Sequence, residues 1–71
     1  SSLGDGDEAI KVLQSAQKQY PNSRDILYAL ATMERDRGNR SQAIAWTEAL
    51  LNLNPADQQA TQLLTELQAT P

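Results

Sequence analysis

The sequence contains neither cysteine nor histidine among its 71 residues. Without cysteine the chain forms no disulfide and no thiolate metal site, and without histidine it lacks the commonest metal ligand and general base. These two absences exclude most metal-dependent hydrolases and most catalytic sites built from a nucleophile and a base. We therefore expect no cofactor, no metal site and no catalytic residue in this chain.

Basic residues are also scarce, since six Lys and Arg stand against nine Asp and Glu, for a net charge of -3. Nucleic acids and anionic membranes bind basic surfaces, so we expect neither as the main partner. No apolar run approaches the roughly 18 residues of a membrane-spanning helix, so we expect no membrane insertion. These features predict a soluble protein, and the absence of thiols leaves its compartment open between cytoplasm and periplasm. We also expect a bacterial source.

Aromatic residues are few, which favours thin layers of helices over one thick core. Apolar residues recur at steps of three and four along the chain, the period of amphipathic helices, and Pro21, Gly38 and Pro55 interrupt them. This pattern predicts an all-α domain over residues 7–70. Residues 1–6 are expected to be a flexible lead-in or the remnant of a tag. The domain would hold four antiparallel helices, over residues 7–20, 24–37, 41–53 and 57–69.

The chain repeats itself with a period of 34 residues. This shift aligns two turn glycines, Gly4 with Gly38, and two helix-ending prolines, Pro21 with Pro55. It also aligns three pairs of apolar residues, which are Ala9 with Ala43, Ile10 with Ile44, and Leu30 with Leu64. A period of 34 residues in a helix-turn-helix pattern is typical of the tetratricopeptide repeat (TPR).

Residues 24–57 resemble one complete tetratricopeptide repeat. The small and large positions of that family correspond to Leu27, Leu30, Ala31, Gly38, Ala43, Leu50 and Pro55. Two residues depart from the family pattern: Glu34 stands where a large residue such as tyrosine is usual, and Thr47 where an aromatic is usual. The resemblance implies one complete repeat between two half-repeats, in an α-α superhelix fragment. We expect the two departures to weaken the core inside the repeat.

The resemblance also implies a non-catalytic protein-protein interaction or scaffold module that docks a peptide or protein partner. In this family the exposed side of the first helix of each repeat usually lines the ligand groove. Matching those positions to this sequence gives a strip of Asp25, Tyr28, Thr32, Arg35, Asp36, Gln59, Gln62 and Glu66. Tyr28 is the aromatic anchor of this strip, because its ring buries contact area at low entropic cost. The alternative interpretation is an ordinary solvated helix face.

A preceding first helix is missing from the repeat register, which leaves one apolar side of the helix over residues 7–20 uncovered. We expect the chain to self-associate or to repack its helices there, with Ile10, Leu13 and Trp46 as candidate contacts. A second function is therefore homotypic: formation of a homodimer, or packing against the rest of the parent chain. A third is that of an accessory segment in an enzyme whose active site lies elsewhere.

Overall fold

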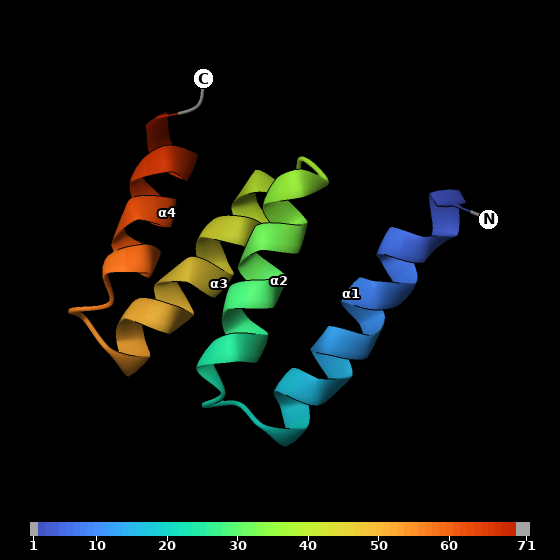
Figure 1. Cartoon of the computed structure of the whole chain (residues 1–71), viewed down its shortest axis with the longest axis horizontal. Helices are drawn as coiled ribbons and strands as arrows, with labels where there is room; N and C mark the ends of the chain where they lie inside the picture. The colour runs from blue at the N-terminus through green and yellow to red at the C-terminus, as the bar shows by residue number, and fades with distance from the viewer. Residues whose placement is uncertain (1, 70–71) are drawn as a thin grey trace.

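The computed structural model describes residues 2–69, and the side chains of residues 6–69. It contains four helices and, among these residues, no strand, which confirms the predicted all-α fold. The helices are α1 (Ser2–Gln19), α2 (Arg24–Asp36), α3 (Arg40–Leu53) and α4 (Gln58–Ala69). They run antiparallel to their neighbours, and α1 and α4 lie at opposite edges of the molecule (Figure 1). The Cα atoms extend over 38 × 33 × 15 Å, so the molecule is a thin slab.

Helix α1 begins at Ser2, well before its predicted start, so the prediction of a flexible lead-in is wrong for the described residues. Gly6, which has no Cβ, leaves room for the guanidinium of Arg37, and Arg37 also donates to the carboxylate of Asp7. These contacts hold the first half of α1 near the end of α2, which favours helix despite the low helix propensity of glycine. The first residue of the predicted lead-in and the predicted domain end at residue 70 lie outside the described residues.

The remaining helix boundaries fall within one residue of the predicted ones, and local signals account for them. Ser23 caps α2, where its Oγ accepts a hydrogen bond from the backbone N–H of Ile26 at 3.4 Å. Asp57 caps α4 in the same way, because its Oδ1 accepts from the backbone N–H of Ala60 at 3.1 Å. After α2, Gly38 adopts a φ of +80°, which glycine tolerates better than any other residue and which ends the helix.

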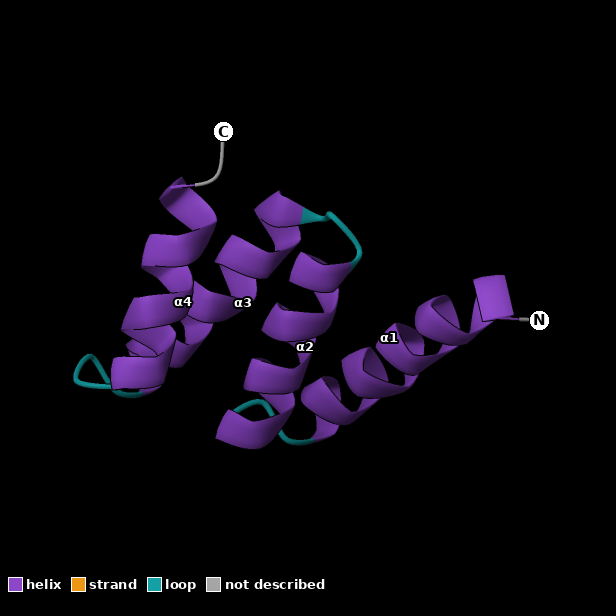
Figure 2. Ribbon diagram, turned by 45° about the horizontal axis from the view of Figure 1, so that its top comes forward, coloured by secondary structure: helices purple, strands orange, loops and turns teal. Residues whose placement is uncertain are grey.

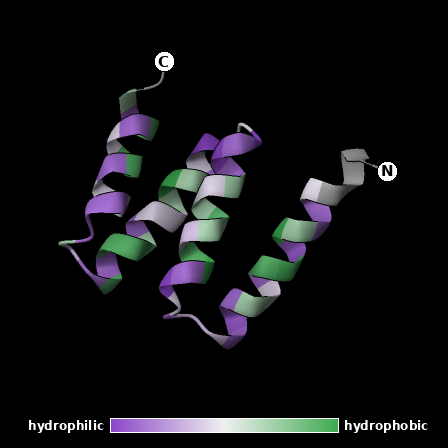
Figure 3. Cartoon of the chain, viewed as in Figure 1, coloured by the Kyte–Doolittle hydropathy of each residue, from purple (hydrophilic) through white to green (hydrophobic). Residues whose placement is uncertain are grey.

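The core consists of two small clusters of buried side chains contributed by α2, α3 and α4. One cluster contains Ala31, Ala43, Leu63 and Leu67, and the other contains Leu27, Leu50 and Ala60. Two half-buried aromatic residues, Tyr28 and Trp46, pack against both clusters and so connect them. Hydrophobic residues are spread along the helices in short segments (Figure 3), as expected where each helix packs on its neighbours in a thin slab.

The two residues that depart from the family pattern both lie in the core. Glu34 is 4% exposed and Thr47 is fully buried. The Oε1 atom of Glu34 accepts a hydrogen bond from the Asn39 side-chain amide at 2.9 Å, and the Thr47 hydroxyl donates to the carbonyl of Ala43 at 2.7 Å. Because each polar group finds a partner close by in the sequence, neither is left unsatisfied inside the repeat.

Helix α1 packs on the molecule by one side only. It contacts α2 and diverges from it toward the N-terminus (Figure 2). Among the described side chains of α1, Ile10 is buried, at 7% exposure, whereas Val12 is 66% exposed. The core therefore belongs mainly to α2, α3 and α4, and α1 is an edge helix with a free apolar side.

Candidate interaction surface

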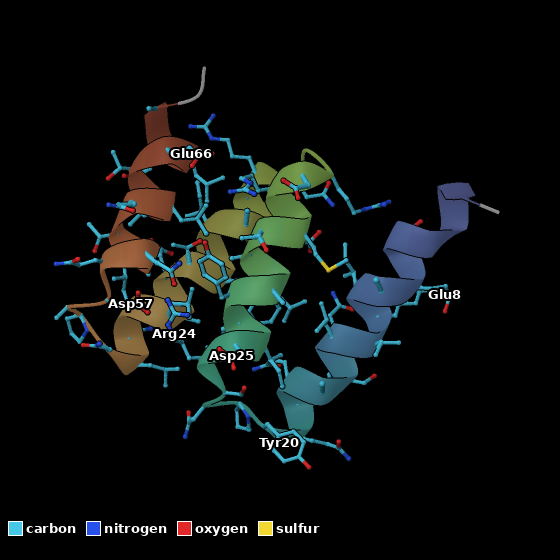
Figure 4. All side chains as sticks on the ribbon, in the orientation of Figure 1. Glu8, Tyr20, Arg24, Asp25, Asp57 and Glu66 are labelled. Atoms are coloured by element: carbon cyan, nitrogen blue, oxygen red, sulfur yellow. The ribbon has the colours of Figure 1, made fainter. Side chains whose placement is uncertain are left out.

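A three-residue polar network joins the start of α2 to the start of α4. The guanidinium of Arg24 donates from Nε and Nη2 to the two carboxylate oxygens of Asp57, at 2.9 and 3.1 Å, in a bidentate pair. Its Nη2 also donates to the side-chain oxygen of Gln59 at 2.7 Å. Figure 4 shows Arg24 and Asp57 pointing toward each other from the two helices. This network fixes the distance between α2 and α4 at one end of the slab.

The network also changes the protonation equilibrium of its two charged members. The hydrogen bond from Arg24, and then the one from the backbone N–H of Ala60, lower the pKa of Asp57 against the opposing effect of burial. The same bond to Asp57 raises the pKa of Arg24. Arg24 lies over the ring of Tyr28, with its guanidinium carbon 5.2 Å from the ring centroid. The ionised pair therefore holds the aromatic anchor of the predicted strip in place.

A second polar link joins the other ends of the same two helices. Arg35 lies between two acids: its Nε donates to Asp36 at 3.0 Å, and its Nη1 lies 3.8 Å from a carboxylate oxygen of Glu66 on α4. All three side chains are at least one-third exposed, so solvent screens these ion pairs and their contribution to stability is small. The link places the charges of the strip in fixed positions along the two helices.

The structure brings most of the predicted partner-binding residues together. Tyr28, Arg35, Asp36, Gln59 and Glu66 take part in the contacts between or along α2 and α4 just described. We call the predicted set of eight residues the α2/α4 surface. Three of the eight make none of these contacts. Asp25 and Gln62 are exposed, and the Thr32 hydroxyl donates back to the carbonyls of Tyr28 and Ala29 in its own helix.

The sequence analysis did not identify Arg24 or Asp57 as part of this surface. A signal for their pairing exists in the sequence, because the two residues have opposite charges and are 33 positions apart, close to one repeat period. Residues separated by about one period lie on corresponding helices of successive repeats. A search for opposite charges at that separation would have found the pair.

The three candidate self-association residues lie mostly inside the molecule. Ile10 is buried, Leu13 is half-buried, and Trp46 packs against both core clusters. The large apolar residues most exposed near α1 are instead Val12 and Tyr20, at 66% and 62%. An apolar surface at this edge of the slab would therefore be built on those two residues more than on the predicted ones.

The described residues contain no group of three or more acidic side chains placed to hold a metal ion. Within the same range, every helix is too short or too polar to cross a membrane.

Comparison with known proteins identifies the repeat. The model of the tetratricopeptide repeat family matches residues 2–67, which is nearly the whole chain. The chain belongs to the tetratricopeptide repeat family. No individually curated protein matches it. Tetratricopeptide repeats generally mediate protein-protein interaction or scaffolding by binding proteins or peptides, and they are typically non-catalytic. The family predicted from the 34-residue period is thus confirmed, whereas the number of repeats stays a prediction.

Proposed function

We propose that this chain docks a peptide or protein segment on its α2/α4 surface. The observation that carries the proposal is the arrangement of Tyr28, which packs on both core clusters and under Arg24 and so is held in one position. A rigid aromatic side chain gives contact area at little entropic cost to binding, and such residues dominate the energy of protein interfaces. The surface would act by passive docking, without a chemical step.

Polar groups around Tyr28 would select the partner. Arg24 and Arg35 already form ion pairs with acidic residues of this chain, so they have little capacity left to bind a carboxylate of the partner. Asp25 on α2 and Gln62 on α4 are exposed, and each offers a hydrogen-bonding group to a partner. A partner would therefore bind through the Tyr28 ring and through hydrogen bonds to such exposed groups, with no single strong ion pair.

The test begins with a library of 12-residue peptides selected against the immobilised chain. The Kd of each selected peptide is then measured for the wild-type chain and for Gln62→Lys, a change on the proposed surface. Gln42→Lys is the matched control, because Gln42 is also exposed but lies on α3. We expect Gln62→Lys to weaken binding at least several-fold and Gln42→Lys to leave it unchanged.

Tyr28 is tested by two substitutions, because its ring also supports the core. Tyr28→Phe keeps the packing, and Tyr28→Ala removes the ring. We expect Tyr28→Ala to weaken binding by tenfold or more, as for an interface hot spot, and circular dichroism identifies any loss that comes from unfolding. If the selected peptides perturb NMR signals of α3 and leave those of Tyr28 and Gln62 unmoved, the proposed function is wrong.

A further inference from the structure

The guanidinium of Arg24 is held in one position between α2 and α4. Its Nε and Nη2 donate to the two carboxylate oxygens of Asp57, and Nη2 donates again to the side-chain oxygen of Gln59. These acceptors lie at the edge of the guanidinium, because its N–H bonds point outward in its own plane. Figure 4 shows Arg24 between the ribbons of the two helices. Edge contacts of this kind fix the group and leave its two flat faces open to other contacts.

One of the two faces is covered by Tyr28 of the same helix. The guanidinium carbon lies over the tyrosine ring, 5.2 Å from its centroid. The Arg24 side chain nevertheless remains 40% exposed. Since the ring covers one face and Asp57 and Gln59 take most of the edge, the opposite face is left to solvent, and we call it the outer face of Arg24. The outer face is a flat, positively charged surface with little freedom to move.

An anionic group of a partner is poorly matched to the outer face. A carboxylate or phosphate binds arginine best through two parallel hydrogen bonds along its edge, and Asp57 already occupies such an edge. The hydrogen bond to Asp57 is the main cause that raises the pKa of Arg24, and the charge of Asp25 adds to it, so two carboxylates lie near the guanidinium. Both would repel an incoming anion.

An aromatic ring matches the outer face in both shape and charge. The face of a benzene or indole ring is flat and electron-rich, so it is attracted to a cation that lies over it. A guanidinium is weakly hydrated, which makes stacking less costly for arginine than for lysine.

Arg24 is also ordered before any partner arrives. Three hydrogen bonds and the contact with Tyr28 already restrict its side chain. A free arginine would lose much side-chain entropy when a ring stacked on it, whereas Arg24 has little left to lose. An aliphatic group on the same face would gain contact area but no attraction to the charge. The outer face therefore favours an aromatic group over an aliphatic one of similar size.

We propose that the partner of the α2/α4 surface places an aromatic side chain on the outer face of Arg24, so that the guanidinium lies between that ring and Tyr28. This inference rests on the proposed docking at the same surface and names the class of partner, a segment that carries Phe, Tyr or Trp. Arg24, which lies outside the eight predicted residues, is then a residue that determines specificity.

A tethered probe tests the stacking without a selected peptide. The chain has no cysteine, so Gln62→Cys introduces a single thiol. Residue 62 is exposed and lies one turn after Gln59, whose side chain contacts Arg24. The thiol is exchanged with disulfides that carry a phenyl, a cyclohexyl or a pentafluorophenyl group on the same flexible linker. The exchange constant against 2-mercaptoethanol, read by mass spectrometry, measures how strongly each group is held, because tethering raises its effective concentration.

The three groups separate contact area from charge. Phenyl and cyclohexyl are similar in size, but only the phenyl face is electron-rich, and fluorine atoms reverse the sign of the charge on the ring face. At residue 62 we expect phenyl to be held about two- to fivefold more strongly than cyclohexyl, and pentafluorophenyl more weakly than phenyl. Gln42→Cys is the matched control, because Gln42 is exposed on α3, and it should show no preference for phenyl.

Substitutions in the Gln62→Cys chain test the role of Arg24 directly. Arg24→Gln removes the charge and keeps a polar side chain, so we expect it to abolish the preference for phenyl. Asp57→Asn keeps Arg24 but weakens the pair that fixes it, so it should reduce the preference. Tyr28→Phe keeps a ring beneath the guanidinium and should retain the preference. Urea unfolding confirms that each variant is folded before its exchange constants are compared.

Two results would overturn the inference. One is that phenyl is held no more strongly than cyclohexyl at residue 62. The other is a preference for phenyl that Arg24→Gln leaves unchanged, since the ring would then contact another part of the surface.

The docking itself fails by a different observation, which is that selected peptides leave the NMR signals of Tyr28 and Gln62 unmoved. Selected peptides that do bind there provide a second test of the inference. Replacing their aromatic residue by cyclohexylalanine should weaken binding about two- to fivefold. Unchanged binding would contradict the aromatic class of partner and leave the docking intact.

Discussion

Asp57 performs two structural tasks with one carboxylate. It caps α4 through the backbone N–H of Ala60, and it receives the guanidinium of Arg24 from α2. Its side chain is only 7% exposed, so both partners act on a group largely withdrawn from water. A charged group with two donors at this point couples the start of one helix to the position of another.

The lowered pKa of Asp57 predicts a loss of stability in acid. Because the folded pKa lies below the unfolded value of about 3.9, ionised Asp57 stabilises the folded chain fully above about pH 4. That contribution is lost as the pH falls through the folded pKa. Arg24, whose pKa is raised, loses its contribution only in strong alkali. We expect Asp57→Asn to lower the urea midpoint at neutral pH by clearly more than Asp25→Asn, which serves as the exposed control.

The measurement is a series of urea unfolding curves between neutral pH and about pH 3, followed by circular dichroism. The difference between wild type and Asp57→Asn should shrink as the wild-type carboxylate becomes protonated. A difference that stays constant over this range would show that the charge of Asp57 does not contribute to stability.

Single residues were predicted well where the signal is local and poorly where it depends on distance in space. A local signal of this kind is Gly38, which the sequence analysis placed between two helices and which ends α2 with a positive φ. The pairing of Arg24 with Asp57 depends on which residues of α2 and α4 lie side by side, and the repeat period predicts this only to within a few residues. The core position of Glu34 follows from the family pattern, but its hydrogen bond from Asn39 was not predicted, because Asn39 lies across a turn.

Helix boundaries in this chain are set by breakers more than by propensity. The ends of α2 and α3 lie within one residue of the expected positions because Gly38 and Pro55 stop each helix regardless of its surroundings. The start of α1 did not match, since no breaker stands there and the contacts of Arg37 with Gly6 and Asp7 come from α2. Tertiary contacts of this kind override weak local preferences.

The turn between α2 and α3 gives a prediction for an element boundary. At Gly38 the positive φ strains any residue with a Cβ, while a Cβ there would meet no atom within 4 Å. Gly38→Ala should therefore destabilise the fold only through the strain of its positive φ, and we expect a loss of about 1 kcal/mol. Urea unfolding measures this loss, and Gly38→Asn is the control that should lose less. Equal stability of wild type and Gly38→Ala would contradict the assignment of this turn.

Across the whole molecule, packing declines from α2 and α3 toward the edge helix α1. The fully buried residues Leu30 and Leu50 lie on the two central helices, whereas residues 6–19 of α1 bury one large apolar residue, Ile10. The slab has no single thick core, as its shortage of aromatic residues predicted. The sequence analysis predicted an uncovered apolar side on the first helix from the repeat register, but it assigned Ile10 to that side, whereas Ile10 is buried.

This gradient predicts the order of amide hydrogen exchange. Backbone amides exchange through local opening, and segments with few buried contacts open at the lowest free energy. We expect amides in the first half of α1 to exchange fastest, those of α4 next, and those around Leu30 and Leu50 slowest. NMR-detected exchange measures this order directly. Uniform protection across the four helices would show that the chain opens as one unit.

The way the helices contact one another also has a kinetic consequence. Contacts between helices are concentrated in the pairs α1 with α2, α2 with α3, and α3 with α4, each formed by segments adjacent in the chain. Such a topology closes only short loops before its contacts form, so the search for the folded arrangement is brief. The chain can therefore complete each hairpin soon after its second helix leaves the ribosome, without waiting for the rest.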